Sequence, residues 1–131
     1  RMSILKKLDP AKLITLIHPS SVISKNSLIG NSTVIMPSVV MNANSRVGNG
    51  CILNTGSILE HDCILKDGVH LAPNSTLCAN VEVGHFSWIG AGSTIIQGIK
   101  IGNNSVIGAG SVVIDDVNNE QRIAGNPADS I

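Results

Sequence analysis

A histidine and an aspartate stand side by side at His61 and Asp62, within the largely apolar stretch SILEHDCIL at residues 57–65. A neutral imidazole accepts protons near pH 7. A carboxylate on its far ring nitrogen fixes the tautomer and stabilises the imidazolium that forms. The pair could therefore be a general base and the residue that orients it, or two polar side chains on a solvated turn. The elements that carry the pair decide between these readings.

Length, charge and cysteine content limit the class of protein. The 131 residues predict a single domain, and a formal net charge of zero argues against nucleic acid or an anionic membrane as partner. No apolar run approaches the roughly 18 residues of a membrane span, and no signal peptide is visible, so we expect no membrane insertion. The three cysteines form no CxxC pair, which indicates a reducing, cytoplasmic compartment.

The chain repeats with a period of six residues. Every sixth residue from Ile17 to Val113 is aliphatic or methionine, without any insertion. The position four residues later is small or aliphatic, and glycine often follows the repeated aliphatic residue directly. The repeated residues are Ile17, Ile23, Ile29, Ile35, Met41, Val47, Leu53, Leu59, Leu65, Leu71, Leu77, Val83, Ile89, Ile95, Ile101, Ile107 and Val113. Neither a helix nor ordinary hairpins have this period, so the pattern predicts short strands joined by tight turns.

Stacked coils of such strands form an all-β solenoid. Alternate residues of a strand face opposite sides, so Val69 and Leu71 point inward while His70 points outward. Pro73 and Asn74 then form a corner, where residues such as Asn and Gly tolerate the backbone angles required. Each strand pairs with strands about 4.8 Å above and below it. The repeat therefore predicts parallel sheets that run along the stack.

The hexads IGAGST at 89–94 and IGAGSV at 107–112 resemble those of the hexapeptide-repeat acyltransferases. The resemblance implies a left-handed parallel β-helix with 18 residues per coil, a triangular section and a homotrimeric assembly. It divides the chain into a lead-in segment (1–16), the β-helix acyltransferase domain (17–118) and a C-terminal tail (119–131). Many relatives carry a separate N-terminal βαβ domain for the nucleotide-sugar, whereas only residues 1–16 precede the first hexad here.

The outward residues independently favour a trimer. With 18 residues per coil they form three columns, of which two are largely apolar or β-branched and one carries more charge. Column one contains Val34, Ile52, His70, Trp88 and Val106, and column two contains Val22, Val40, Ile58, Thr76, Thr94 and Val112. Apolar faces of this extent mark an interface, and a three-fold ring that packs column one on a neighbour's column two covers both. His61 of one chain could then approach His70 of the next.

The stretch NTGSILEHDCILKDGVHLAPNSTLCANVEVG is similar to the sugar O- and N-acyltransferases of bacterial surface-glycan pathways. Their motif is Asn-Thr, a histidine followed by an acid, and then a second histidine. The resemblance implies acetyl-CoA as donor, His61 as general base with Asp62 beside it, and substrate binding by Asn54. It also implies donor binding by His70, by the backbone N–H of Ala79, which would face the thioester oxyanion, and by the backbone of Ala91 and Ala109.

The acceptor is expected to be the amino group of a nucleotide-linked 4-amino sugar, and a sugar hydroxyl, as in sialic acid, is the alternative. The segment AGNPA at 124–128 resembles the family's C-terminal segment near the CoA nucleotide. Relatives usually continue with Lys or Arg, whereas Asp129 follows here, so a contact with the CoA phosphates does not carry over.

Two other classes of protein share this fold. The γ-type carbonic anhydrases bind zinc through three histidines, with a spacing of five residues. Here His61 and His70 are nine residues apart with no suitable third histidine, so we expect no metal. A non-catalytic β-helix scaffold is the second alternative, against which the intact motif argues.

Overall fold

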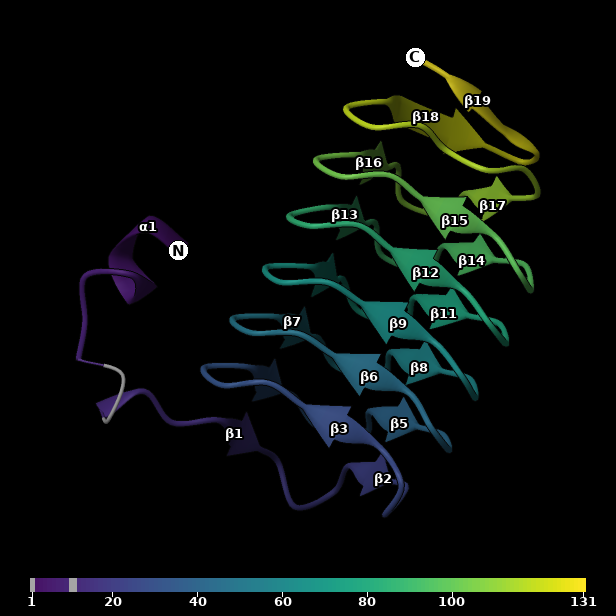
Figure 1. The fold of residues 1–131 in the computed structure, drawn as a ribbon. Coiled ribbons are helices and arrows are strands. Elements are labelled where there is room, and N and C mark those ends of the chain that lie inside the picture. The colour runs from purple at the N-terminus through teal and green to yellow at the C-terminus, as the bar shows by residue number, and fades with distance from the viewer. Residues whose placement is uncertain (1, 10–11) are drawn as a thin grey trace.

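The computed structural model describes residues 2–9 and 12–131; residues 1, 10 and 11, which fall in the predicted lead-in segment, lie outside the described residues. The described chain is an all-β parallel solenoid whose short strands stack coil upon coil (Figure 1). Strands pair at a spacing of 18 residues, so that His70 lies level with Ile52 on one side and Trp88 on the other. The predicted all-β fold and coil length are confirmed.

The strands form three sheets, parallel throughout except for the last strand of sheet 1, with about six turns to the stack. Sheet 1 contains β1 (Leu16–Ile17), β4 (Val34–Ile35), β7 (Ile52–Leu53), β10 (His70–Leu71), β13 (Trp88–Ile89), β16 (Val106–Ile107), β18 (Arg122–Gly125) and β19 (Ala128–Ser130). Sheet 2 contains β2 (Val22–Ile23), β5 (Val40–Met41), β8 (Ile58–Leu59), β11 (Thr76–Leu77), β14 (Thr94–Ile95) and β17 (Val112–Val113). Sheet 3 contains β3 (Leu28–Ile29), β6 (Arg46–Val47), β9 (Ile64–Leu65), β12 (Glu82–Val83) and β15 (Lys100–Ile101).

The turns between the sheets form three corners that run along the stack. Corner 1/2, between sheets 1 and 2, contains residues 54–57, 72–75, 90–93 and 108–111. Corner 2/3 contains residues 42–45, 60–63 and 78–81, and corner 3/1 closes each coil. Most turns include a residue with positive φ, which is either a glycine such as Gly56 or a residue such as Asn44, Asp62 or Asn74. Asn and Asp tolerate this left-handed conformation better than most residues with a side chain.

The core is a narrow stack of aliphatic side chains. In the middle coils the second residue of each strand is buried, as in Leu59, Leu71 and Leu77, while the first faces outward. Several buried hydroxyls are satisfied by carbonyl groups one coil above, as where Ser87 Oγ donates to Gly102 O at 2.6 Å. The aromatic side chains stay outside this core: Trp88 and Phe86 are both exposed.

The ends of the chain differ from the repeat. Helix α1 (Met2–Leu5) lies beside the stack rather than within it (Figure 1). At the other end β18 continues sheet 1 by pairing in parallel with β16, and β19 folds back antiparallel on β18. Within residues 2–9 and 12–131, no helix combines the length and the apolar character needed to cross a membrane.

Candidate functional site

The His61–Asp62 pair lies on corner 2/3, directly after β8. Nδ1 of His61 lies 2.8 Å from Oδ2 of Asp62, and the two side chains are 53% and 43% exposed. A carboxylate only accepts hydrogen bonds, so Nδ1 carries the proton and donates it to Asp62. The lone pair of the ring is then on Nε2, the atom that a general base needs. The predicted pair is therefore in contact, and His61 is oriented by its neighbour.

Asn44 binds the other oxygen of the same carboxylate. It lies one coil below Asp62 and its Nδ2 donates to Oδ1 at 3.1 Å. The hydrogen bond from His61 and, secondly, that from Asn44 lower the pKa of Asp62 below its ordinary value of 3.8. Asp62 is thus held as a carboxylate, with both oxygens engaged, at any pH near neutrality.

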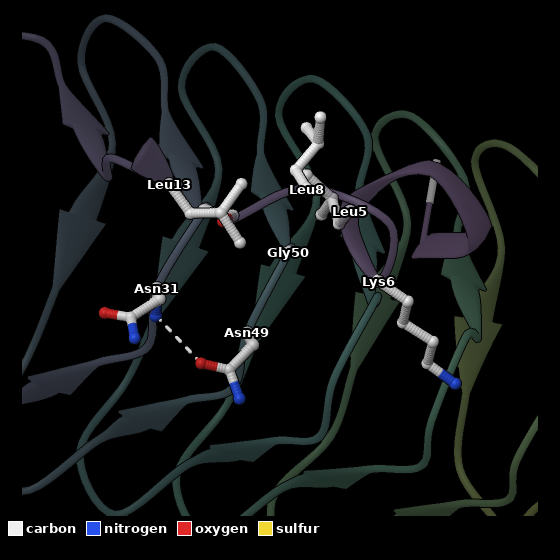
Figure 2. A pocket seen from close by; sticks show the side chains of 8 residues that line it. Leu5, Lys6, Leu8, Leu13, Asn31, Asn49 and Gly50 are labelled. Atoms are coloured by element: carbon white, nitrogen blue, oxygen red, sulfur yellow. Dashed lines mark hydrogen bonds between the residues drawn. The ribbon is translucent and has the colours of Figure 1, made fainter. Parts of the chain in front are cut away.

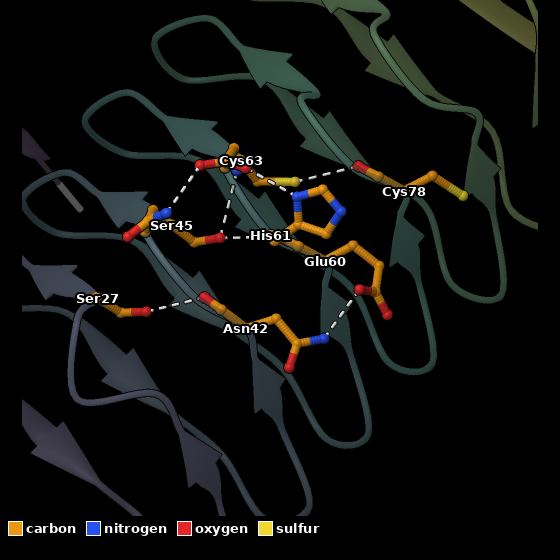
Figure 3. A network of polar contacts seen from close by, with 9 residues as sticks. Ser27, Asn42, Ser45, Glu60, His61, Cys63 and Cys78 are labelled. Carbon is orange, nitrogen blue, oxygen red and sulfur yellow. Dashed lines mark hydrogen bonds and ion pairs between the residues drawn. The ribbon is translucent and has the colours of Figure 1, made fainter.

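The backbone on either side of His61 is anchored by contacts between coils (Figure 3). Ser45 Oγ donates to the carbonyl of Glu60 at 2.8 Å, and Asn42 Nδ2 donates to Glu60 Oε2 at 2.9 Å. On the other side, Cys63 Sγ donates to the carbonyl of Cys78 at 3.1 Å. Burial raises the pKa of the Cys63 thiol to about 11, so this thiol stays protonated and serves packing rather than nucleophilic chemistry.

His70 lies on sheet 1 in contact with two side chains. Its ring stacks on Trp88, with a centroid separation of 5.5 Å and an interplanar angle of 8°. Its Nε2 lies 3.3 Å from Nδ2 of Asn54, which belongs to the coil below. The structure therefore brings together Asn54 and His70, two residues of the predicted motif, and adds Trp88 to them.

An open groove of about 410 Å³ runs up sheet 1 and corner 1/2 from this stack. Its lining includes His70, Trp88, Ala91 and Ala109, and is otherwise apolar or backbone. Among the described residues, the N–H groups of Ala91 and Ala109 donate no hydrogen bond. Three of the four predicted donor-binding residues therefore share one groove, with backbone donors available along it.

Ala79, the fourth, lies elsewhere. It stands one coil above His61 on corner 2/3, where its carbonyl accepts a hydrogen bond from Gly98 N at 2.9 Å. The predicted site residues thus fall into two groups. His61, Asp62 and Ala79 lie on corner 2/3, whereas Asn54, His70, Ala91 and Ala109 lie at sheet 1 and corner 1/2. A single chain does not unite the two groups.

Sequence reasoning missed two contacts of these groups, Asn44 with Asp62 and Trp88 with His70. Each contact joins residues that are 18 positions apart in the sequence. The coil period was therefore the signal that could have found both, once outward and corner residues are compared between adjacent coils.

Another hollow lies beside α1, between Leu5, Leu8 and Leu13 and the corner residues Asn31 and Asn49 (Figure 2). The polar groups of that corner already bind each other, since Asn31 N donates to Asn49 Oδ1 at 2.9 Å. None of the predicted site residues lines this hollow, so it is not the candidate site. Over the described ranges, no group of three His, Cys, Asp or Glu residues could hold a metal ion.

Comparison with known proteins agrees with the six-residue repeat of the chain. The model of the bacterial transferase hexapeptide family (six repeats) matches residues 80–115. Residues 80–115 are therefore similar to the hexapeptide repeats of that family. The sequence-based resemblance to the sugar acetyltransferases of that group is confirmed by the solved structures to which the chain is similar. No curated protein matches the chain.

Two solved structures illustrate this similarity. A histidine-to-alanine variant of GDP-perosamine N-acetyltransferase from Caulobacter crescentus, in complex with CoA and GDP-perosamine, is 37% identical with a TM-score of 0.90. The match covers 91% of this chain and 57% of that one. The acetyltransferase domain of PglB from Neisseria gonorrhoeae is 34% identical with a TM-score of 0.97, over 100% of this chain and 65% of that one. The chain therefore spans about three fifths of these relatives' length.

Proposed function

We propose that the protein is an acetyl-CoA-dependent acetyltransferase acting on the amino group of a nucleotide-linked 4-amino sugar. The observation that carries the proposal is the 2.8 Å contact between His61 Nδ1 and Asp62 Oδ2, which leaves Nε2 of an exposed imidazole as proton acceptor. The similarity to an N-acetyltransferase in complex with CoA and GDP-perosamine supports the choice of substrates. The PglB acetyltransferase domain has likewise been solved in complex with acetyl coenzyme A.

In the proposed reaction the amine nitrogen attacks the thioester carbonyl carbon. His61 Nε2 takes a proton from that nitrogen as the new N–C bond forms, and Asp62 stabilises the imidazolium. The C–S bond then breaks, and the CoA sulfur leaves with the proton returned by His61, so that an amide and a free thiol are produced. Base catalysis of this kind contributes roughly 10²–10⁴-fold to the rate. The backbone N–H of Ala79, one coil above His61, is the proposed donor to the oxyanion.

The groove on sheet 1 suits the donor. Acetyl-CoA carries a long, flexible arm with amide groups, and the groove offers an apolar wall with the unpaired N–H groups of Ala91 and Ala109 beside it. We assign donor binding to His70, Ala91 and Ala109, and substrate binding to Asn54. No metal has a role in this proposal.

A homotrimeric, left-handed β-helix would unite the two groups of site residues. The outer faces of sheets 1 and 2 carry exposed apolar side chains, among them Trp88 (52% exposed) and Val22 (66% exposed). Packing sheet 1 of one subunit on sheet 2 of the next would cover both faces. It would also place the corner of His61 beside the groove of His70 on the neighbouring subunit. We therefore propose an active site between subunits.

We propose the same division of the chain as before: a lead-in at 1–16, the β-helix domain at 17–118 and a tail at 119–131. We place the reaction in the cytoplasm. All three cysteines, Cys51, Cys63 and Cys78, are free thiols, which suits a reducing compartment.

The experiment that tests the function measures release of CoA thiol from acetyl-CoA with a panel of GDP-, UDP- and dTDP-linked 4-amino sugars and sialic acids. His61→Ala is compared with His85→Ala, because His85 is an exposed corner histidine that lines no part of the proposed site. Release with a 4-amino sugar that is lost only in His61→Ala is expected. Release with a hydroxyl acceptor alone would replace the amine by O-acetylation, and failure to bind acetyl-CoA would favour a scaffold.

A further inference from the structure

The His70 ring is in contact with one side chain from the coil below and one from the coil above. Asn54 reaches up from the start of corner 1/2, and Trp88 reaches down from β13. Neither contact follows from the motif, which places the residues in a site without saying what they do to one another.

The amide of Asn54 has a defined orientation. The backbone N–H of Thr55 donates to Asn54 Oδ1 at 2.8 Å, and only an oxygen can accept that bond. The opposite end of the amide, Nδ2, therefore faces Nε2 of His70 at 3.3 Å. An amide nitrogen has hydrogens to donate and no lone pair to offer, so Nε2 of His70 is the acceptor. The ring proton of His70 must then lie on Nδ1.

Trp88 defines the plane of the same ring. The two ring systems are nearly parallel, 8° apart, with their centroids separated by 5.5 Å. Stacked aromatic rings at this separation attract each other beyond simple burial. Tilting the imidazole out of this plane would break the stack, and turning the ring over would break the bond from Asn54. The orientation of His70 is thus determined twice.

We propose that Asn54 and Trp88 are positioning residues for His70: Asn54 holds its imidazole in the tautomer protonated on Nδ1, and Trp88 holds its plane. The consequence for catalysis rests on the proposed function, because a single orientation of His70 matters only if that ring contacts the donor. The tautomer itself is a property of the folded protein, so it can be measured whether or not the enzyme reaction is correctly assigned.

The test is long-range ¹H–¹⁵N NMR of the imidazole rings in the ¹⁵N-labelled protein, at a pH where the histidines are neutral. Loss of one ring's signals in His70→Asn assigns them among the four histidines. We expect the wild-type ring to carry its proton on Nδ1. Asn54→Ala should allow the proton to move to Nε2, which is the usual tautomer in water. Asn54→Asp should force protonation of Nε2, because a carboxylate can only accept.

Asn49→Ala is the matched control: like Asn54, Asn49 accepts a backbone N–H on Oδ1 and donates from Nδ2, but its partners are Asn31 and Asp67, away from the proposed site. Its His70 signals should equal those of the wild type. Trp88→Phe should keep a single sharp set of ring signals, whereas Trp88→Leu, which is apolar without a stacking face, should broaden or split them. A wild-type ring protonated on Nε2, or a tautomer unchanged by Asn54→Asp, would overturn the role of Asn54. Unchanged signals in Trp88→Leu would overturn that of Trp88.

Kinetics supply the second readout. Asn54→Ala and Trp88→Leu should raise KM for acetyl-CoA roughly two- to tenfold, as loss of one positioning contact predicts. Trp88→Phe should raise it less than Trp88→Leu, and Asn49→Ala should leave it unchanged. A changed tautomer with an unchanged KM would separate the two proposals: the positioning of His70 would stand and its contact with the donor would fall.

Discussion

Asp62 accepts hydrogen bonds on both carboxylate oxygens, from Nδ1 of His61 at 2.8 Å and from Nδ2 of Asn44 at 3.1 Å. Asp62 also occupies the left-handed position of its turn, with φ of 61°. The residue that the repeat needs for its corner is therefore the residue that orients His61. An exposed pair is held in one arrangement by the turn itself and by the coil below.

Replacing Asp62 by Asn should lower kcat for acetyl transfer by roughly 10²-fold or more, because His61 loses the partner that fixes its tautomer and stabilises its charged form. KM for acetyl-CoA should stay close to the wild-type value, since Asp62 lies outside the groove on sheet 1. Steady-state kinetics check this split. Asp115→Asn, an exposed acid further along the stack, is the control. Equal kcat in the two variants would contradict the role of Asp62.

The two hydrogen bonds that Asp62 accepts should lower its pKa by different amounts. Asn44→Ala should raise it toward the ordinary 3.8, and His61→Ala should raise it further, because the bond from His61 is the largest cause of the lowering. NMR titration of the side-chain carboxyl carbon measures both shifts. A larger effect of Asn44→Ala than of His61→Ala would reverse this order.

The same lowered pKa has a consequence for stability. Asp62 binds protons more weakly in the folded than in the unfolded chain, so its stabilising contribution is complete above pH 3.8 and is lost as pH falls through the lowered folded pKa. The stability of the wild-type protein should therefore fall in acid as Asp62 is protonated, and Asp62→Asn should lack this contribution. Between pH 6 and 8 Asp62 should make neither protein's stability depend on pH. A difference in slope confined to neutral pH would argue against the assignment.

An active site between subunits predicts complementation of inactive variants. His61→Ala and His70→Ala subunits, unfolded and refolded together, should regain part of the wild-type acetyl transfer, because some interfaces of a mixed trimer pair an intact His61 with an intact His70. Each variant refolded alone should stay at its own residual rate, and light scattering should show trimers in every sample. If verified mixed trimers regained no acetyl-transfer activity, both histidines of a site would have to lie on one chain.

Replacing either of two buried serines by alanine should change stability in opposite directions. Ser57 Oγ is buried and has no hydrogen-bond partner among the described residues, so Ser57→Ala should raise the free energy of unfolding by about 1 kcal/mol. Ser87 Oγ donates to Gly102 O at 2.6 Å and accepts from Ser105 N at 3.0 Å. Ser87→Ala leaves the Gly102 carbonyl and the Ser105 N–H without these partners, and should lower the free energy of unfolding by about 1–3 kcal/mol.

Denaturant unfolding of the two variants beside wild type measures both changes. The comparison is matched because the same atom is removed from the same inward position of two hexads. A loss of stability in Ser57→Ala equal to that in Ser87→Ala would show that the Ser57 hydroxyl has a partner in solution.

Much of the fold could be predicted because a strict period of six leaves few structures open. The positions of Leu59, Leu71 and Leu77 within the repeat place them in the core, and they are fully buried. The contact of His61 with Asp62 was also predictable, since the two residues are adjacent in the chain. The catalytic and binding roles of these residues, the trimer and the hand of the helix stay predictions.

By itself, the sequence determined the coil length, the inward residues and the corner that carries His61, because hydrophobic burial at a fixed spacing selects a single register. Only the tertiary structure decided that Asn44 binds Asp62, that Trp88 stacks on His70 and that Asn54 turns its amide nitrogen toward that ring. It also separated the predicted site into two groups on different corners. These relationships depend on side-chain rotamers and hydrogen-bond directions between neighbouring coils, which a linear period does not specify.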